Sequence, residues 1–278
     1  MNTAVTAGID GIGITFADFH SLESIVSHLF TGVTADHFRP SRRQQDWYRQ
    51  THLLRTTEGT VLAAWHSGST STFGRRNLLQ VHGLAFSDSA LNAFRPLDLY
   101  KFIDGAVALD GHVSALDVYV DDLAGLSPME LIREQSQPGK YKDFIRCSFL
   151  KDYAGKNTVP FPSGNSFYYG KRGRQYSKVL IYPKHLCPHQ RISEPGNQPK
   201  LTWVRYELQL RGATAREKGN DLLRELWFPF SPDGEKITKG KAISDLLSRH
   251  FAFVKPAKRS SRRTPQDWWS ELLRRASL

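Results

Sequence analysis

Hydrophobic and polar residues alternate along several segments of the chain, a two-residue period that is typical of β-strands with one buried face. The alternation is clearest in Thr202–Arg211 (TWVRYELQLR), and it recurs in His112–Asp122 and in Ser177–Lys184. Shorter runs of apolar and β-branched residues predict further strands at Gly11–Phe16, Thr60–Trp65, Asn77–Leu84 and Ser166–Lys171. A sheet built from such strands has one face in the hydrophobic core and one polar face.

Helical periodicity marks the segments between these strands. Helices are predicted over Ser21–Leu29, Ala90–Asp104, Met129–Gln135 and Thr214–Leu226. In the last of these, Thr214 and Glu217 have the spacing of a capping box, in which each side chain binds a backbone N–H at the helix start. Because strands dominate and the connections are both hairpins and helices, the sequence predicts an α+β fold with a largely antiparallel sheet and helices on one face.

The composition is that of a folded protein with a basic surface. Hydrophobic residues make up 40% of the 278 positions and charged residues 23%. Lys and Arg number 38 against 27 Asp and Glu, and the resulting formal charge of +11 favours a polyanionic partner. Two cysteines, Cys147 and Cys187, cannot build a disulfide framework, which fits a reducing compartment. No segment has the pattern of a signal peptide or a membrane span, so we expect a cytoplasmic protein that does not enter a membrane.

The C-terminal segment differs in composition from the rest of the chain. Lys255–Arg263 (KPAKRSSRR) is basic and rich in serine, which predicts a flexible linker. A short helix after Thr264-Pro265 would carry an apolar side formed by Trp268, Trp269, Leu272 and Leu273. We therefore predict a main domain of residues 1–254 and a basic tail of residues 255–278. The tail either contacts a polyanion or a partner, or folds back on the domain.

The polar faces of three predicted strands carry residue types that can do chemistry. Aspartate is depleted in strands because its side chain competes for backbone hydrogen bonds, so two aspartates on one strand face need a reason. Asp117 and Asp121 share such a face in one strand, and Glu207 lies on the polar face of another. Their oxygens are ligands suited to Mg²⁺ or Mn²⁺. A surface held by salt bridges is the alternative explanation.

A tyrosine on the same face would supply a nucleophile. A phenol that attacks a phosphodiester forms a covalent phosphotyrosine, and a nearby cation stabilises the charge that develops. Tyr182, which shares its strand face with Lys178 and Lys184, meets these requirements. A tyrosine that only packs on the sheet is the alternative. The other candidates nearby are Tyr168, Tyr169 and Tyr176.

Three motifs, taken in order, resemble the replication initiation factor family (Rep_trans), which includes plasmid rolling-circle initiators, relaxases of integrative elements and filamentous-phage replication proteins. They are VSALDVYVDD, YYGKRGRQYSKVLIYPK and WVRYELQLR, and GIDGIGITF near the start resembles the family's first strand. The resemblance implies that Tyr182 nicks one DNA strand and that Asp117, Asp121 and Glu207 form the metal site. The chain departs from the family pattern at Ala115 and Leu180, where many members have arginine.

These features together predict a metal-dependent tyrosine DNA nickase that starts rolling-circle replication, with Mg²⁺ or Mn²⁺ as cofactor. Lys184 is expected to assist Tyr182, and the residues expected to contact DNA are Lys171, Arg172, Arg174, Lys178 and Arg205. The expected partners are origin DNA, single-stranded or supercoiled, and a host helicase and polymerase. Whether the protein forms a homodimer is left open. The alternative function is a non-catalytic basic DNA-binding regulator, although a pure binder gains nothing from carboxylates that repel phosphates.

Other chemistries lack their motifs. The chain has no histidine–hydrophobe–histidine metal triplet, and for His185, Cys187 and His189 a loop is favoured over a zinc site because Pro188 blocks a helix there. A phosphate-binding loop is also absent, since Gly155-Lys156 is followed by asparagine, so ATP hydrolysis is not expected. An RNA-binding sheet would need a dense pair of outward aromatic residues, which these strands lack.

Overall fold

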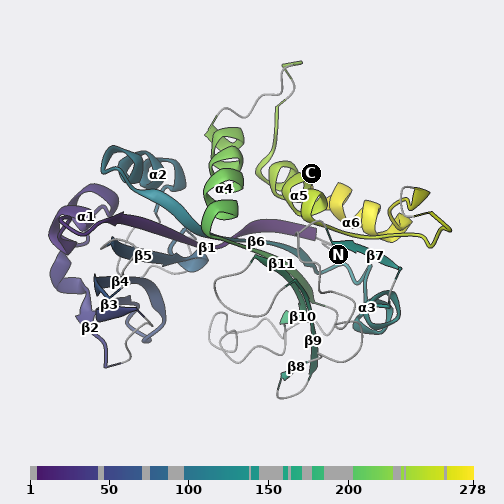
Figure 1. The fold of residues 1–278 in the computed structure, drawn as a ribbon, viewed down its shortest axis with the longest axis horizontal. Coiled ribbons are helices and arrows are strands. Elements are labelled where there is room, and N and C mark those ends of the chain that lie inside the picture. Colours follow the sequence, from purple (N-terminus) through teal and green to yellow (C-terminus); the bar gives the residue numbers. More distant parts are fainter. Residues whose placement is uncertain are drawn as a thin grey trace. The chain divides into compact units, whose positions relative to one another are not determined.

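The fold is described from a computed structural model, in which the chain forms two compact units (Figure 1). The structure describes residues 5–42, 47–70, 76–86, 97–137, 139–143, 159–161, 164–170, 177–184, 203–227, 233–234, 236–259 and 262–278. Unit 1 consists of Met1–Gly8, Asp117–Thr214 and Asp221–Leu278, and unit 2 of Ile9–Leu116 and Ala215–Asn220. Within the described ranges, no helix combines the length and the apolar character needed to cross a membrane.

Unit 2 contains strands in the hydrogen-bonded order β2-β3-β4-β5-β1-β6. Strands β1 and β6 are divided between the two units, and only part of each belongs to unit 2. The strands are β2 (Arg39–Pro40), β3 (Tyr48–Arg55), β4 (Val61–Ser69), β5 (Arg76–His82), β1 (Val5–Ala17) and β6 (His112–Asp122). The helical elements are α1 (Leu22–Leu29), η1 (Ala35–His37), η2 (Gly83–Phe86) and α2 (Leu99–Ala108). Ser21 caps α1, because its side chain accepts a hydrogen bond of 3.2 Å from the N–H of Ser24.

Unit 1 contains the remaining parts of β1 and β6, followed by β11, β10, β9 and β8 in that hydrogen-bonded order. These strands are β11 (Val204–Arg211), β10 (Lys178–Pro183), β9 (Gly164–Gly170) and β8 (Val159–Phe161), and a second, small sheet pairs β12 (Phe251–Phe253) with β7 (Tyr141–Asp143). The helices are α3 (Met129–Gln135), α4 (Gly212–Trp227, of which residues 215–220 belong to unit 2), α5 (Lys239–His250) and α6 (Asp267–Ala276).

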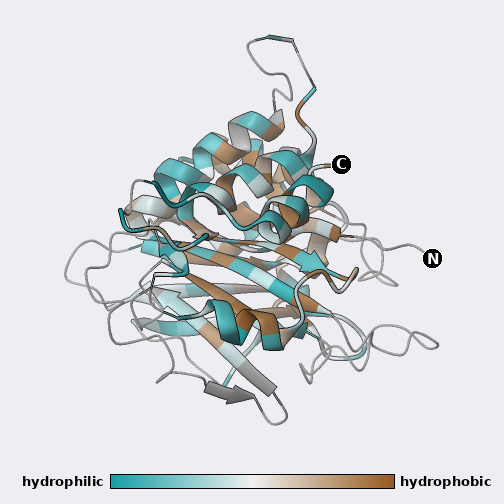
Figure 2. Ribbon diagram, turned by 90° about the vertical axis from the view of Figure 1, so that its right-hand side faces the viewer, coloured by the Kyte–Doolittle hydropathy of each residue, from teal (hydrophilic) through white to brown (hydrophobic). Residues whose placement is uncertain are grey.

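Helices cover one face of the unit 1 sheet. Val204, Tyr206, Leu208 and Leu210 of β11 are all buried, and polar residues occupy the positions between them. Figure 2 shows hydrophobic and hydrophilic residues alternating along strands of the sheet. The ring of Trp269 in α6 lies 5.3 Å from that of Tyr206, which places α6 against this apolar face. The polar side chains of β11, at the alternate positions, therefore lie on the opposite face of the sheet.

The α+β fold with a largely antiparallel sheet is confirmed, since β1–β5, β3–β4, β4–β5, β9–β10 and β10–β11 are all antiparallel pairs. The predicted strand at His112–Asp122 and helix at Met129–Gln135 have the observed bounds. The capping box at Thr214 is wrong, because α4 already begins at Gly212. The part of the helix predicted from Ala90 that precedes Leu97 lies outside the described residues.

The C-terminal segment is part of unit 1, which corresponds to the second of the two alternatives for it, a tail that folds back on the domain. The backbone N–H of Lys255 donates to the carbonyl of Thr264 at 2.8 Å, and an antiparallel bridge joins Val254 to Pro265. The predicted helix is present as α6, and Trp269 within it is only 1% exposed. The basic composition of the preceding segment suggested a separate tail, but the apolar side of the helix is packed into the core.

Candidate active site on the polar face of unit 1

The candidate residues lie on the polar face formed by β6, β11 and β10, as the alternation predicted. This face is not solvated. Asp121 is 3% exposed, and Tyr182, Arg205 and Glu207 are each 5% exposed. Buried polar groups need partners, because an unpaired one costs more than a hydrogen bond returns. The hydrogen-bond partners of these four side chains therefore define the site.

The phenol of Tyr182 is hydrogen-bonded to both a carboxylate and a lysine ammonium group. In the register of β10 and β11 it stands opposite Arg205, while Glu207 stands opposite Leu180. The phenol reaches diagonally and donates a hydrogen bond of 2.9 Å to Oε2 of Glu207. Lys184 Nζ lies 3.4 Å from the phenolic oxygen, to which it donates, and 5.6 Å from the ring centroid. The phenol thus has a carboxylate that can take its proton and a cation that can stabilise its negative charge.

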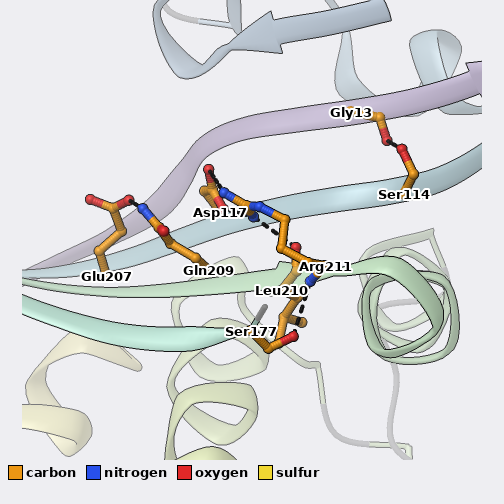
Figure 3. A network of polar contacts seen from close by, with 8 residues as sticks. All are labelled: Gly13, Ser114, Asp117, Ser177, Glu207, Gln209, Leu210 and Arg211. Atoms are coloured by element: carbon orange, nitrogen blue, oxygen red, sulfur yellow. Dashed lines mark hydrogen bonds and ion pairs between the residues drawn. The ribbon is translucent and has the colours of Figure 1, made fainter. Parts of the chain in front are cut away.

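Gln209 holds the other oxygen of the glutamate. Its side-chain Nε2 donates a short hydrogen bond to Oε1 of Glu207 (Figure 3). The two residues lie on the same face of β11 because they are two positions apart in one strand. Both carboxylate oxygens of Glu207 therefore accept hydrogen bonds from neutral groups.

Each of the two aspartates is held by an arginine of β11. Arg205 Nε and Nη2 donate to the two oxygens of Asp121, both at 2.7 Å, and the guanidinium carbon lies 3.8 Å from the ring centroid of Tyr119. Arg211 donates in the same forked manner to both oxygens of Asp117, with the Nη2 contact at 3.0 Å (Figure 3). Forked arginine–carboxylate pairs are strong and fix geometry, so they bind β6 to β11.

The three carboxylates do not fit a single cation site as they are arranged. Guanidinium groups take both oxygens of Asp117 and of Asp121, and no group of three His, Cys, Asp or Glu side chains in the described part of the chain is placed to hold a metal ion. A cation on these ligands would have to displace two arginines. The requirement for Mg²⁺ or Mn²⁺ stays a prediction.

The residues predicted to contact DNA are only partly within the described structure. Lys171, Arg172 and Arg174 lie outside the described residues, as do Tyr176 and the set His185, Cys187 and His189. Lys178 is half-buried, and its Nζ lies 6.0 Å from the ring centroid of Tyr168. Arg205 is buried and its guanidinium is bound to Asp121, and its contact with DNA stays a prediction.

Four other described tyrosines of unit 1 are placed differently. Tyr169 points to the helix-covered face, where its hydroxyl is bound to Ser136 and burial raises its pKa above the ordinary value. Tyr206 lies in the core on the same side, and burial raises its pKa as well. Tyr168 and Tyr119 lie on the polar face, each beside a cation. Tyr182 differs from these four in that its hydroxyl is hydrogen-bonded to both a carboxylate and a lysine.

Sequence reasoning assigned no role to Gln209, Arg211 or Tyr119. The signal was present, because Arg205, Glu207, Gln209 and Arg211 occupy successive positions on one strand face. Partner choice depends on how β6 and β11 are aligned, however, and a single sequence does not contain that alignment.

The fold and the site together define an α+β protein with a buried tyrosine–glutamate pair on the polar face of an antiparallel sheet. No protein-family model and no curated protein matches the sequence. Among solved structures, the chain is similar to one described as the rolling circle replication initiator protein from Geobacillus stearothermophilus. The similarity has a TM-score of 0.66 at 16% sequence identity, and it covers 99% of this chain and 97% of the other. The two proteins therefore share their fold over almost their whole lengths.

Proposed function

We propose that this protein initiates rolling-circle replication by nicking one strand of its origin DNA through Tyr182. The observation that carries the proposal is the contact of the Tyr182 phenol with Glu207 at 2.9 Å and with Lys184 at 3.4 Å. The shared fold with a protein described as a rolling-circle replication initiator supports it, as does the formal charge of +11.

In the proposed reaction, the phenolic oxygen of Tyr182 attacks a DNA phosphorus and displaces the 3′ oxygen of the preceding nucleotide. The product is a 5′ phosphotyrosine, which keeps the bond energy for rejoining, and a free 3′ hydroxyl that a polymerase can extend. Lys184 lies beside the attacking oxygen, where its charge opposes the charge that builds up on the phosphate. Unwinding is assigned to a separate helicase, because the chain lacks a phosphate-binding loop.

The proposal requires the site to open. With 5% of Tyr182 exposed, a DNA strand reaches the phenol only after what covers it has moved. Origin binding is therefore expected to increase the exposure of Tyr182. This step would couple recognition of the origin to nicking.

The test uses the full-length protein and DNA from its own replicon, with and without Mg²⁺ or Mn²⁺. Tyr182→Phe keeps the ring and its packing but removes the attacking oxygen, so it should bind DNA normally and form no covalent adduct on a denaturing gel. Tyr168→Phe is the matched control on the neighbouring strand of the same face, and it should retain most of the activity. An adduct formed by Tyr182→Phe would refute the assignment. If the wild-type protein binds DNA but forms no adduct under any metal condition, the non-catalytic regulator is the better account.

A further inference from the structure

We propose that Trp47, the residue before β3 in unit 2, stacks on an unpaired base of single-stranded DNA, and that Arg42 and Arg49 beside it contact the phosphates of that strand. The inference rests on the proposed function, to which it adds a DNA contact outside the nicking site. It concerns DNA binding by unit 2 alone, so it can fail while nicking by Tyr182 stands.

Trp47 combines an exposed ring with a strained backbone. It is 72% exposed, and its φ of 76° lies in the left-handed region, which is a genuine outlier for a bulky residue. The other described non-glycine residue with a positive φ is Asp110, and aspartate adopts this conformation more readily. A single exposed aromatic residue is ordinary on a protein surface. One that is held in a strained conformation without being buried needs a further reason, and such strain is typical of ligand-binding positions.

The neighbouring residues hold the backbone of Trp47 in this conformation. Its carbonyl accepts a hydrogen bond of 2.8 Å from the N–H of Thr70. The next residue, Tyr48, pairs with Ser69 in the register of β3 and β4, and its ring lies 5.6 Å from that of His66. The sheet therefore fixes the chain directly after Trp47 while the indole stays exposed. A ring that is already held in place loses little freedom when a ligand stacks on it.

Two exposed arginines lie near Trp47 in unit 2. Arg49 follows it by two positions in β3. The antiparallel pairing of Pro40 with His52 directs the chain after β2 towards the start of β3, which brings Arg42 to the same end of that strand. Among the ion pairs between described residues, none involves either guanidinium. Their charges are therefore placed for an anionic ligand.

An exposed aromatic ring flanked by arginines matches the chemistry of a nucleic-acid single strand. Its bases stack on aromatic side chains and its phosphates attract cations. In a duplex each base is already stacked on its neighbours, so a base that stacks on Trp47 has to be unpaired. Nicking followed by unwinding, as proposed above, would produce such a strand. The surface is therefore assigned to single-stranded DNA rather than to duplex DNA.

The test is equilibrium binding of the full-length protein to a labelled oligonucleotide of about 16 thymidines, measured by fluorescence anisotropy over a range of salt concentrations. Trp47→Ala should weaken binding by roughly 5- to 150-fold, the effect expected when a base loses its aromatic stacking partner. The salt dependence of binding should not change, because no phosphate contact is lost. Phe19→Ala is the matched control. Phe19 is an aromatic residue of unit 2 that is 77% exposed and follows Asp18, and its loss should leave the affinity unchanged.

The arginines should give a different signature. Arg42→Gln and Arg49→Gln should each weaken binding and lower the slope of log affinity against log salt by about 0.7, because each removes one phosphate contact on a single strand. Lys101→Gln provides the control, since Lys101 is an exposed cation of unit 2 in the helix α2. Its replacement should leave the slope unchanged.

Two further measurements separate stacking from a structural role. With an oligonucleotide that has abasic sugars in place of the thymidines, the difference in affinity between the wild type and Trp47→Ala should disappear, because the phosphates are present but the bases are not. Trp47→Gly should lose the same affinity for the thymidine strand as Trp47→Ala. Because glycine adopts a positive φ without strain, its Tm should be no lower than that of the wild type.

The inference is overturned if Trp47→Ala binds the thymidine strand as tightly as Phe19→Ala, and the surface would then belong to another kind of partner. An equal loss on the abasic strand, or a lower Tm of Trp47→Gly, would also overturn it. In each case an adduct formed by the wild type and absent from Tyr182→Phe leaves the proposed function standing. Absence of an adduct in the wild type refutes the proposed function, whatever the affinities.

Discussion

Replacement of Trp269 by alanine tests how the C-terminal helix is attached. The side chain is 1% exposed, and its ring lies 5.3 Å from Tyr206, 5.8 Å from Phe251 and 5.6 Å from Phe253. Truncation of a buried tryptophan costs about 3–5 kcal/mol, a large part of the roughly 5–15 kcal/mol that stabilises a domain. At about 2–4 °C per kcal/mol for a domain of about 150–250 residues, the Tm should fall by about 6–20 °C.

The assay is thermal unfolding followed by circular dichroism, with Ser270→Ala as the control. Ser270 is exposed on the same helix, so its replacement should change stability by no more than about 0.5 kcal/mol. The C-terminal end of the helix also packs closely against α5 at Gly240. A Cβ at that position would lie only 1.9 Å from the carbonyl oxygen of Ala276, so the contact requires a glycine. Equal unfolding temperatures for Trp269→Ala and Ser270→Ala would refute this packing and restore the separate tail.

Two further predictions concern stability. Asp121→Asn removes the charge that Asp121 places beside the buried guanidinium of Arg205, which should destabilise unit 1 by about 3–5 kcal/mol. Asp117→Asn should destabilise it less, because the pair of Asp117 and Arg211 is more exposed. Urea unfolding of both variants checks which of them loses more stability. Burial lowers the pKa of His66 below its ordinary value of 6.5, while the hydrogen bond to Gln80 opposes this shift. The unfolded chain therefore binds a proton at His66 more readily than the folded protein, and the free energy of unfolding should fall as the pH drops below 6.5. In His66→Gln the free energy of unfolding should depend less steeply on pH in this range. An unchanged pH dependence would contradict the lowered pKa of His66.

The strands of the site could be predicted because their side-chain pattern is regular. Leu116, Val118 and Val120 are buried as the alternation in His112–Asp122 predicted, and so the aspartates were assigned to the correct face. The strand β3 (YRQTHLLR) was missed, since its polar residues do not alternate with apolar ones. Local pattern thus recovers a strand only where one of its faces is consistently apolar.

The contacts within the site could not be predicted from the sequence. Asp117 and Asp121 were expected to share a cation, whereas each is paired with an arginine of β11. Such pairs depend on the alignment of strands far apart in the chain. The burial of the polar face was missed for a similar reason, because alternation shows which side chains share a face but not what covers it.

The most direct test of the central claim is to identify the residue that carries the DNA. After reaction with origin DNA, digestion with nuclease and trypsin should release the peptide Val179–Lys184 (VLIYPK), whose one tyrosine is Tyr182. Mass spectrometry is expected to find the nucleotide on this peptide, linked through the 5′ phosphate. A nucleotide on a peptide that contains Tyr119, Tyr168 or Tyr176 instead would contradict the assignment of Tyr182, and no linked peptide at all would contradict nicking by a tyrosine.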